Sequence, residues 1–254
     1  MLAAEAVRQG FETIVAAGGD GTVNEVVNGI GDEPQGFFKS RFAVLPLGTI
    51  NVFAKELALP LNFEQGWELI RAGKELSIDV PAAEFSADGK TSSRYFAQMA
   101  GAGLDSRAIE LVDWDLKKKV GGLAYVVAGM KAICQPMPDI SVTNGQETFT
   151  GKLVLIGNGR YYGGRLNFFP KADLQDGLLE VSIFPRADLE ALARCGIGLL
   201  TDTLHQFGGA KYLRGTSISL QSAQPVALHL EGENVGHLPA KIYMSDQKLR
   251  VIVP

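Results

Sequence analysis

A glycine-rich loop is the part of the sequence best suited to chemistry, and it consists of Gly18, Gly19, Asp20, Gly21 and Thr22. Glycines let a backbone approach a ligand closely, and the free N–H groups of a following helix favour an anion such as phosphate. A carboxylate beside phosphate makes sense if a divalent cation lies between them. Thr22 can cap the helix or donate to a phosphate oxygen. A tight turn with an Asx cap explains the loop equally well.

A second loop of the same character follows the next apolar segment. Gly48 and Thr49 come directly after Pro46 and Leu47, and Asn51 then leads into a predicted helix. Adjacent parallel strands would bring this loop beside the first one, at one edge of a sheet. Two glycine loops at one crevice therefore predict a phosphate-binding site more firmly than either loop does alone.

Two carboxylates near the end of the chain form a third candidate. Glu231 and Glu233 are separated only by Gly232 and follow a predicted strand over residues 226–230. Carboxylates that share a face repel each other, which raises the pKa of one of them and makes it a better base. The alternative is a solvated acidic turn, which the residues by themselves favour.

The first third of the chain alternates helices with apolar strands. Each strand is followed by a turn and a helix, an order that predicts an α/β domain with a parallel sheet whose ligands lie at the carboxyl ends of the strands. The predicted strands cover residues 13–17 and 42–45, and the predicted helices cover residues 2–9, 23–30, 51–57 and 63–72.

The pattern changes after Lys74 to short alternating runs with Asp-Gly and Asn-Gly turns, which predict an antiparallel β domain. Two predicted helices, over residues 122–133 and 189–204, interrupt it. The predicted strands cover residues 77–80, 94–100, 139–143, 152–156, 178–184, 217–220, 226–230 and 249–253. We place the domain boundary near residues 73–77, which gives domains of residues 1–75 and 76–254.

Composition argues against several classes of protein. The 254 residues include 30 glycines and carry a formal charge of −4, which gives no polybasic surface for nucleic acid. The apolar stretches are too short to span a bilayer, and the first ten residues lack the apolar core of a secretory signal. Cys134 and Cys195 stand far apart and are expected to be reduced thiols, and the three histidines show no metal-ligand spacing. We expect a soluble, cytoplasmic protein.

Several segments together resemble the diacylglycerol kinase catalytic-domain family, which includes sphingosine kinases and bacterial lipid kinases. The resemblance starts with the two glycine loops and continues in the same order to the end of the chain. The segments that carry it are residues 17–26, 45–51, 101–105, 157–159, 162–164, 170–177 and 231–233. The family fold implied is an N-terminal α/β domain similar to phosphofructokinases and NAD kinases, followed by a β-sandwich-like domain with inserted helices.

The resemblance implies ATP-dependent, Mg²⁺-dependent phosphorylation of a lipid hydroxyl in the cleft between the domains, as in phospholipid biosynthesis. Phosphoryl transfer needs positioning and charge neutralisation more than covalent catalysis, and the loops suit that demand. By position, Asp20 would organise the catalytic Mg²⁺. The residues expected to hold the nucleotide are Gly18, Gly19, Asp20, Gly21, Thr22, Val23, Asn24, Gly48 and Thr49.

The family also places the base for the acceptor hydroxyl in the acidic segment near the end of the chain. Glu233 matches the family's Glu directly and is the first candidate. Glu231 stands where the family usually has Asp, which keeps the carboxylate but extends it by one methylene. In this interpretation Glu231 tunes the pKa of Glu233.

A second metal site is implied by residues 171–178, which resemble a structural Mg²⁺ loop of bacterial members. Asp176 would supply a carboxylate, and the backbone carbonyls of Asp173 and Leu178 would supply further oxygen ligands. The alternative is an Asp-Gly turn before a strand. Val52 stands where the family usually has an Asp that supports the metal network, and a valine side chain cannot take that role.

Family members normally begin with a strand, a phosphate loop and a helix that precede the helix at Leu2, so we expect this chain to lack a leading portion and to expose a strand edge. Two other functions stay open: an NAD kinase, and a non-catalytic nucleotide- or lipid-binding module. Expected partners are ATP, a lipid substrate and, transiently, a membrane surface, with a homodimer left open. The identity of the lipid is not indicated.

Overall fold

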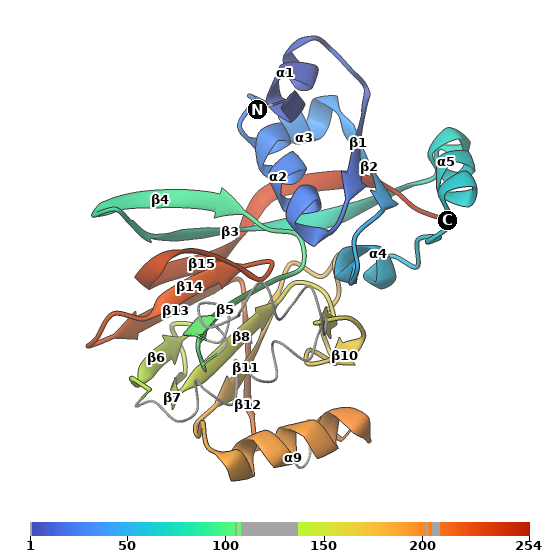
Figure 1. Ribbon diagram of the computed structural model, residues 1–254. Coiled ribbons are helices and arrows are strands. Elements are labelled where there is room, and N and C mark those ends of the chain that lie inside the picture. Colours follow the sequence, from blue (N-terminus) through green and yellow to red (C-terminus); the bar gives the residue numbers. More distant parts are fainter. Residues whose placement is uncertain (1, 105, 108–136, 202, 205–208) are drawn as a thin grey trace, which may run out of the picture.

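The computed structural model describes residues 2–104, 106–107, 137–201, 203–204 and 209–254. Figure 1 shows the first three helices, which fall within residues 2–39, on one side of a twisted sheet and helix α9 (Leu189–Leu200) on the opposite side. The N-terminal elements are α1 (Leu2–Arg8), β1 (Thr13–Gly18), α2 (Asp20–Gly31), α3 (Gly36–Lys39), β2 (Arg41–Pro46), α4 (Val52–Glu56) and α5 (Phe63–Ala72). The predicted βα order of this part is therefore present.

Strands β1 and β2 run parallel, with Gly18 opposite Pro46 at their carboxyl ends. Both strands therefore end where a glycine loop begins. They do not form a parallel sheet of their own, which corrects the sequence-based expectation. Parallel pairing is limited to these two strands and to one contact between Val251 and Phe42, through which they join a sheet that is otherwise antiparallel.

The β-rich part follows helix α5. In the described chain, nine of its strands run side by side in the order β12-β11-β8-β5-β14-β15-β13-β6-β7, and β3 pairs with β15 and β4. The strands are β3 (Glu75–Ala87), β4 (Lys90–Tyr95), β5 (Met99–Gly103), β6 (Ile140–Thr143), β7 (Thr148–Gly151), β8 (Leu153–Gly157), β9 (Tyr161–Tyr162), β10 (Leu166–Asn167), β11 (Leu179–Phe184), β12 (Lys211–Gly215), β13 (Ser217–Ser222), β14 (Ala227–Leu230) and β15 (Glu233–Ile252).

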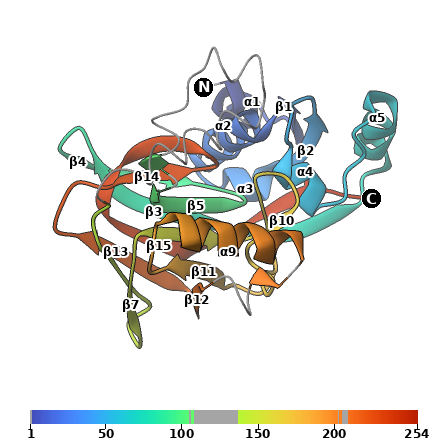
Figure 2. The same cartoon turned by 60° about the horizontal axis from the view of Figure 1, so that its bottom comes forward.

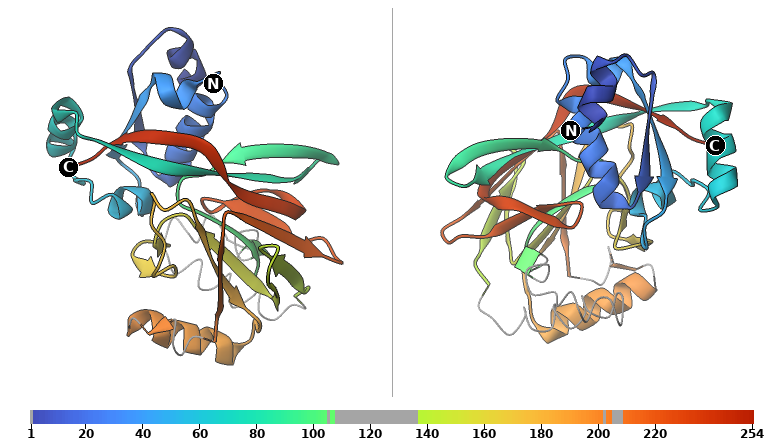
Figure 3. Two further views of the ribbon diagram at one scale, coloured as in Figure 1. Left: turned by 180° about the vertical axis from the view of Figure 1, so that it is seen from behind. Right: turned by 45° about the horizontal axis from the view of Figure 1, so that its top comes forward.

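Strand β15 connects the two parts of the molecule. It pairs with β14 and β13 along its first half and with β3 along most of its length, and near its end Val251 lies beside β2. The end of β15 lies next to α5 in both views of Figure 3. Ile252 and Ile70 belong to the same buried apolar cluster. The sequence pattern indicates only the last few residues of this strand, because Gly236 and Pro239 interrupt its alternation.

Separate hydrophobic cores support the two parts. One core fills the N-terminal part and includes Val27, Ile30, Phe42 and Phe53. The other lies within the β-rich part, where Ile156 and Ile218 are fully buried. Burial of this apolar surface is the main stabilising contribution to each part.

Other predicted elements differ in detail. The run predicted as one strand over residues 94–100 is divided between β4 and β5, and the helix predicted to reach residue 204 ends at Leu200. Figure 2 shows α9 lying across the strands of the β-rich part. The predicted helix over residues 122–133 lies outside the described residues, as do Cys134 and His205. Within the described chain, no helix is long and apolar enough to cross a membrane, and no strand pairs with the second edge of β1.

Candidate active site

The two glycine loops touch each other directly. Leu47 N–H donates to the carbonyl of Gly18 at 3.0 Å. A Cβ atom added to Gly48 would lie 2.5 Å from the Cα of Gly19, closer than real Cβ atoms come to a backbone. Any side chain at position 48 would therefore push the loops apart, which explains the glycine at this position.

The N-terminus of α2 points its backbone N–H groups into this junction. Its N-cap is Gly19, which has no side chain to accept a hydrogen bond from the first turn. The positive end of the helix is therefore available to an anion. Thr22 is exposed and folds back over Gly18.

Two of the residues expected at the nucleotide site face the interior instead. Val23 is buried, and its N–H donates to the carbonyl of Gly19 within the helix. Asn24 is buried, and its side-chain oxygen accepts from the side chain of Asn28 at 3.1 Å. The structure therefore leaves Gly18 to Thr22, together with Gly48 and Thr49, at the surface of the junction.

Asp20 joins the first loop to helix α4. Its two carboxylate oxygens accept hydrogen bonds from the N–H groups of Val52 and Phe53, each at 3.0 Å. The preceding residue, Asn51, has a left-handed backbone, and its side-chain amide donates to the carbonyl of Gly48 at 2.7 Å. Asp20 thus caps α4 although it lies far from this helix in the sequence. Val52 contributes only its backbone N–H to this contact, and the Val52 side chain is buried.

The acidic segment is the turn of the β14–β15 hairpin. Leu230 pairs with Glu233, and the two residues between them have positive φ angles, 52° at Glu231 and 79° at Gly232. Two-residue hairpins with this backbone have a twist that matches the twist of the strands. The turn carries both carboxylates toward the glycine loops of the N-terminal part.

The structure gives the two carboxylates different surroundings. Glu231 Oε1 accepts hydrogen bonds from the N–H groups of Ala97 at 2.8 Å and Gln98 at 2.7 Å. The pKa of Glu231 is raised to about 8, mainly by burial. These hydrogen bonds lower the pKa, whereas the nearby charge of Asp20 raises it further. Glu233 is exposed, and its Oε1 atom lies 2.7 Å from the place of a Cβ on Gly21.

A further carboxylate, that of Glu56, attaches α4 to the β-rich part and is not predicted from the sequence. Glu56 is only 5 % exposed, and it accepts hydrogen bonds from the backbone and side chain of Arg160, from Tyr161 N–H and from the side chain of Gln98. The hydrogen bond that Arg160 donates to Glu56 is the main cause that raises the pKa of Arg160. No local signal marks Glu56, because its partners lie 42 to 105 positions further along the chain.

The residues expected to hold a structural Mg²⁺ have other partners. One oxygen of Asp176 accepts from Leu178 N–H at 2.9 Å, and the other binds the guanidinium of Arg214. Asp173 accepts from Gln175 N–H, and the described residues contain no group of three acidic, histidine or cysteine side chains suited to a metal. The structural Mg²⁺ in this loop stays a prediction, and Arg214 already supplies positive charge to Asp176.

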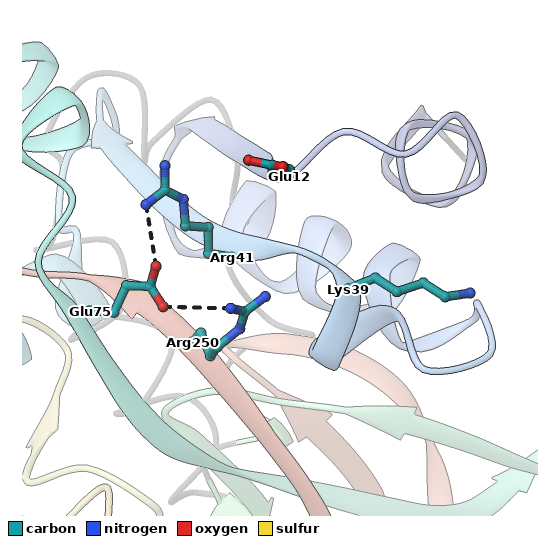
Figure 4. Close-up of a pocket in the computed structure, with 5 residues that line it drawn as sticks. All are labelled: Glu12, Lys39, Arg41, Glu75 and Arg250. Atoms are coloured by element: carbon teal, nitrogen blue, oxygen red, sulfur yellow. Dashed lines mark hydrogen bonds and ion pairs between the residues drawn. The ribbon is translucent and has the colours of Figure 1, made fainter.

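A charged pocket of about 330 Å³ lies at the opposite ends of β1 and β2 from the glycine loops. Figure 4 shows Glu75 between the two arginines, with ion pairs of 3.2 Å to Arg41 and 3.7 Å to Arg250. The pocket therefore takes no part in the junction. It is lined by Glu12, Lys39, Arg41, Glu75 and Arg250.

Two known families match consecutive parts of the chain. Residues 1–83 match the family described as the diacylglycerol kinase catalytic domain, and residues 98–253 match the YegS C-terminal NAD kinase beta sandwich-like domain. The chain belongs to the diacylglycerol kinase family. As a member of this family it is an enzyme of the kinase class, and its candidate site is formed by residues from both matched regions.

Individual proteins of this family match nearly the whole chain. A diacylglycerol kinase of Staphylococcus saprophyticus is 30 % identical over 255 residues, which cover 99 % of this chain and 80 % of the relative. A protein of Stenotrophomonas maltophilia named "Probable lipid kinase YegS-like" is 31 % identical, covering 99 % of this chain and 82 % of that protein. A crystal structure of a diacylglycerol kinase from Bacillus anthracis superposes with a TM-score of 0.70 at 23 % identity, covering 100 % of this chain and 79 % of that one. The structural likeness supports the two-part fold.

Proposed function

We propose that this enzyme transfers the γ-phosphoryl group of ATP to the hydroxyl group of a lipid of the diacylglycerol type. The observation that carries the proposal is that the turn holding Glu231 and Glu233 lies against the first glycine loop, with Glu233 beside Gly21 and Glu231 close enough to feel the charge of Asp20. The helix terminus and the two touching glycine loops suit the donor phosphates. A carboxylate with a raised pKa suits the acceptor hydroxyl. The names of the relatives support the lipid acceptor.

The nucleotide phosphates would bind at the N-terminus of α2, against the backbone of Gly19 to Thr22 and of Gly48 and Thr49. Asp20 would hold the two loops together through α4 and leave the helix terminus facing the phosphates. Carboxylate oxygens of Asp20 and Glu233 are suited to the Mg²⁺ that accompanies ATP, which would neutralise phosphate charge. The buried, unpartnered side-chain oxygen of Asn51 lies in the same junction.

We assign the base to Glu231 rather than to Glu233, which differs from the sequence-based hypothesis. A general base must be held in place and must have a pKa near the working pH. Two backbone N–H groups hold one oxygen of Glu231, and its pKa lies near that range. Glu233 is exposed beside the helix terminus, where a carboxylate suits a cation better than a hydroxyl proton.

Access to a lipid requires contact with a membrane surface at least for the time of the reaction. Leu47 and Ile50, which flank the second glycine loop, are 59 % and 37 % exposed. Apolar side chains beside the phosphate site suit a protein that works at the surface of a bilayer. We therefore propose a cytoplasmic enzyme that associates peripherally with membranes.

An assay with radiolabelled ATP and separate panels of lipids and NAD tests the proposal. The purified chain should label a diacylglycerol-type lipid in mixed micelles and should leave NAD unlabelled. Labelling of NAD alone would establish an NAD kinase. Binding of ATP and lipid without transfer of label would establish a non-catalytic module, and either result would contradict the proposed function.

A further inference from the structure

Helix α4 is a short bridge whose two ends are attached to different halves of the candidate site. At its first residues, the N–H groups of Val52 and Phe53 donate to Asp20 of the glycine loop. At its last residue, Glu56 binds the β-rich part. Five helical residues span only about 7 Å, so the helix leaves little freedom between these attachments.

The Glu56 carboxylate is buried, and both of its oxygens accept hydrogen bonds. Its Oε1 atom accepts from Arg160 Nε at 2.8 Å, and its Oε2 atom accepts from the N–H groups of Arg160 and Tyr161 at 2.8 and 3.2 Å. Oε2 also accepts from Gln98 Nε2 at 3.1 Å. A buried carboxylate with this many charge-assisted partners holds them in a fixed geometry.

Gln98 links this attachment to Glu231. Its side chain is buried between Glu56 and the carbonyl of Tyr161, while its backbone N–H donates to Glu231 Oε1 at 2.7 Å. A continuous series of hydrogen bonds thus runs from Asp20 through α4, Glu56 and Gln98 to Glu231. The carboxylate at 231 is oriented by the backbone N–H groups of Ala97 and Gln98, and Glu56 holds the side chain of Gln98.

The geometry points to Glu56 as a positioning residue that sets the placement of Glu231 relative to the phosphate-binding loops. This inference rests on the proposed function for its effect on turnover, and on the hydrogen bonds alone for its effect on structure. Glu56 itself does not touch the reacting groups. Its substitution should therefore lower kcat while leaving the affinity for ATP nearly unchanged.

The test compares Glu56→Gln with Glu64→Gln, which removes a carboxylate on exposed helix α5. Glutamine keeps the shape of Glu56 but replaces one acceptor oxygen with an NH₂ group that faces the donors. A displacement of the base by about 1 Å can cost up to ~100-fold in rate, so we expect kcat to fall by about 10- to 100-fold in Glu56→Gln only. The KM for ATP should stay within about twofold.

A double variant distinguishes positioning from general destabilisation. If Glu56 acts through Glu231, adding Glu56→Gln to Glu231→Gln should change kcat by less than about twofold, because the group being positioned is already absent. Independent losses that multiply in the double variant would overturn the inference. Should Glu56→Gln fail to fold, Arg160→Lys removes the guanidinium contact at a more exposed position and is expected to give a smaller decrease in kcat with the same non-additivity.

Hydrogen exchange provides a readout that needs no catalysis. In Glu56→Gln without substrate, the amides of residues 97 and 98 should lose protection together with those of residues 160 and 161, whereas Glu64→Gln should match the wild type. Loss of protection confined to residues 160 and 161 would overturn the positioning role. Failure of the wild-type chain to phosphorylate any lipid would contradict the proposed function without affecting this measurement.

Discussion

The carboxylate of Asp20 accepts a hydrogen bond from the backbone N–H of Val52 at 3.0 Å, across an interval of 32 residues. This contact, with its counterpart from Phe53, fixes the start of helix α4 against the first glycine loop. A valine side chain at position 52 is compatible with the contact, since only the backbone takes part. Asp20 therefore has a structural task as well as its proposed task beside the nucleotide.

Replacing Asp20 with Asn tests both tasks. Asn keeps one acceptor oxygen but loses the other and the charge, so we expect stability to fall by about 1 kcal/mol, as for loss of one hydrogen bond. Turnover should fall by a much larger factor, because the loop also positions the phosphates. Thermal melting and initial rates measure the two effects. A variant with unchanged melting temperature would show that Asp20 does not cap α4.

Replacing Gly48 with Ala should weaken ATP binding by roughly tenfold or more. The added Cβ would lie 2.5 Å from Gly19 Cα and 2.6 Å from Asn51 Oδ1, so the loops must separate. Loss of one hydrogen bond to a charged phosphate costs about 1.5 kcal/mol, which corresponds to roughly tenfold in affinity. Calorimetric titration with ATP gives the affinity.

Gly89→Ala is the matched control for this variant. Gly89 has a φ of +73° and no atom within 4 Å of an added Cβ, and it lies in the β3–β4 turn. The Gly89→Ala substitution therefore introduces backbone strain far from the glycine loops. Equal affinities of Gly48→Ala and wild type for ATP would place the phosphates elsewhere.

The stability of the protein should depend on pH through Glu231. Its pKa is raised from 4.5 in the unfolded chain to about 8 in the fold, so between these values the folded state binds more protons than the unfolded state. This contribution therefore decreases stability as pH rises from about 4.5 to about 8, and it is constant above that range. Glu231→Gln should lack this pH-dependent loss of stability. Its melting temperature should therefore rise relative to that of wild type as the pH increases from about 4.5 to about 8.

Glu64→Gln serves as the reference in the same series, since it removes an exposed carboxylate of helix α5. Its melting curve should follow that of wild type at each pH. If Glu231→Gln also follows wild type across the window, the carboxylate is ionised in the fold with an ordinary pKa, and the argument for a raised pKa is wrong.

The loop around Asp176 should be stabilised by Arg214 and not by Mg²⁺. Both Asp176 and its arginine partner are partly buried, and the guanidinium also donates to the carbonyl of Lys171 at 3.1 Å. We expect Asp176→Asn to lower the melting temperature by a few degrees. Added Mg²⁺ should shift the melting temperatures of wild type and variant equally. A Mg²⁺-dependent increase that Asp176→Asn abolishes would restore a structural metal site.

The general plan of the site could be predicted from the sequence. Alternating strands, turns and helices place the two glycine loops at the same ends of β1 and β2, and a glycine between two glutamates indicates the hairpin turn that carries them. These features depend on short segments whose residues are neighbours in the chain. Local propensity and glycine geometry are sufficient to indicate them.

Contacts between distant segments could not be predicted in the same way. The partners of Asp20 and Glu56 are backbone groups or side chains that only the folded chain brings near, and backbone donors leave no mark in the sequence. The long strand β15 was also missed, because register shifts break its alternation between His237 and Ala240 and between Met244 and Lys248. Its contact with β2 is what merges the two predicted sheets into one.

The initial rate of phosphate transfer from ATP to diacylglycerol by Glu231→Gln, compared with Glu233→Gln and wild type, shows whether Glu231 is the general base. Glutamine at position 231 can still accept from Ala97 and Gln98 but cannot take up a proton from the acceptor hydroxyl. We predict a kcat about 10²- to 10⁴-fold below wild type with ATP affinity retained, as for loss of a general base, and a smaller loss for Glu233→Gln. Wild-type turnover in Glu231→Gln would contradict the account.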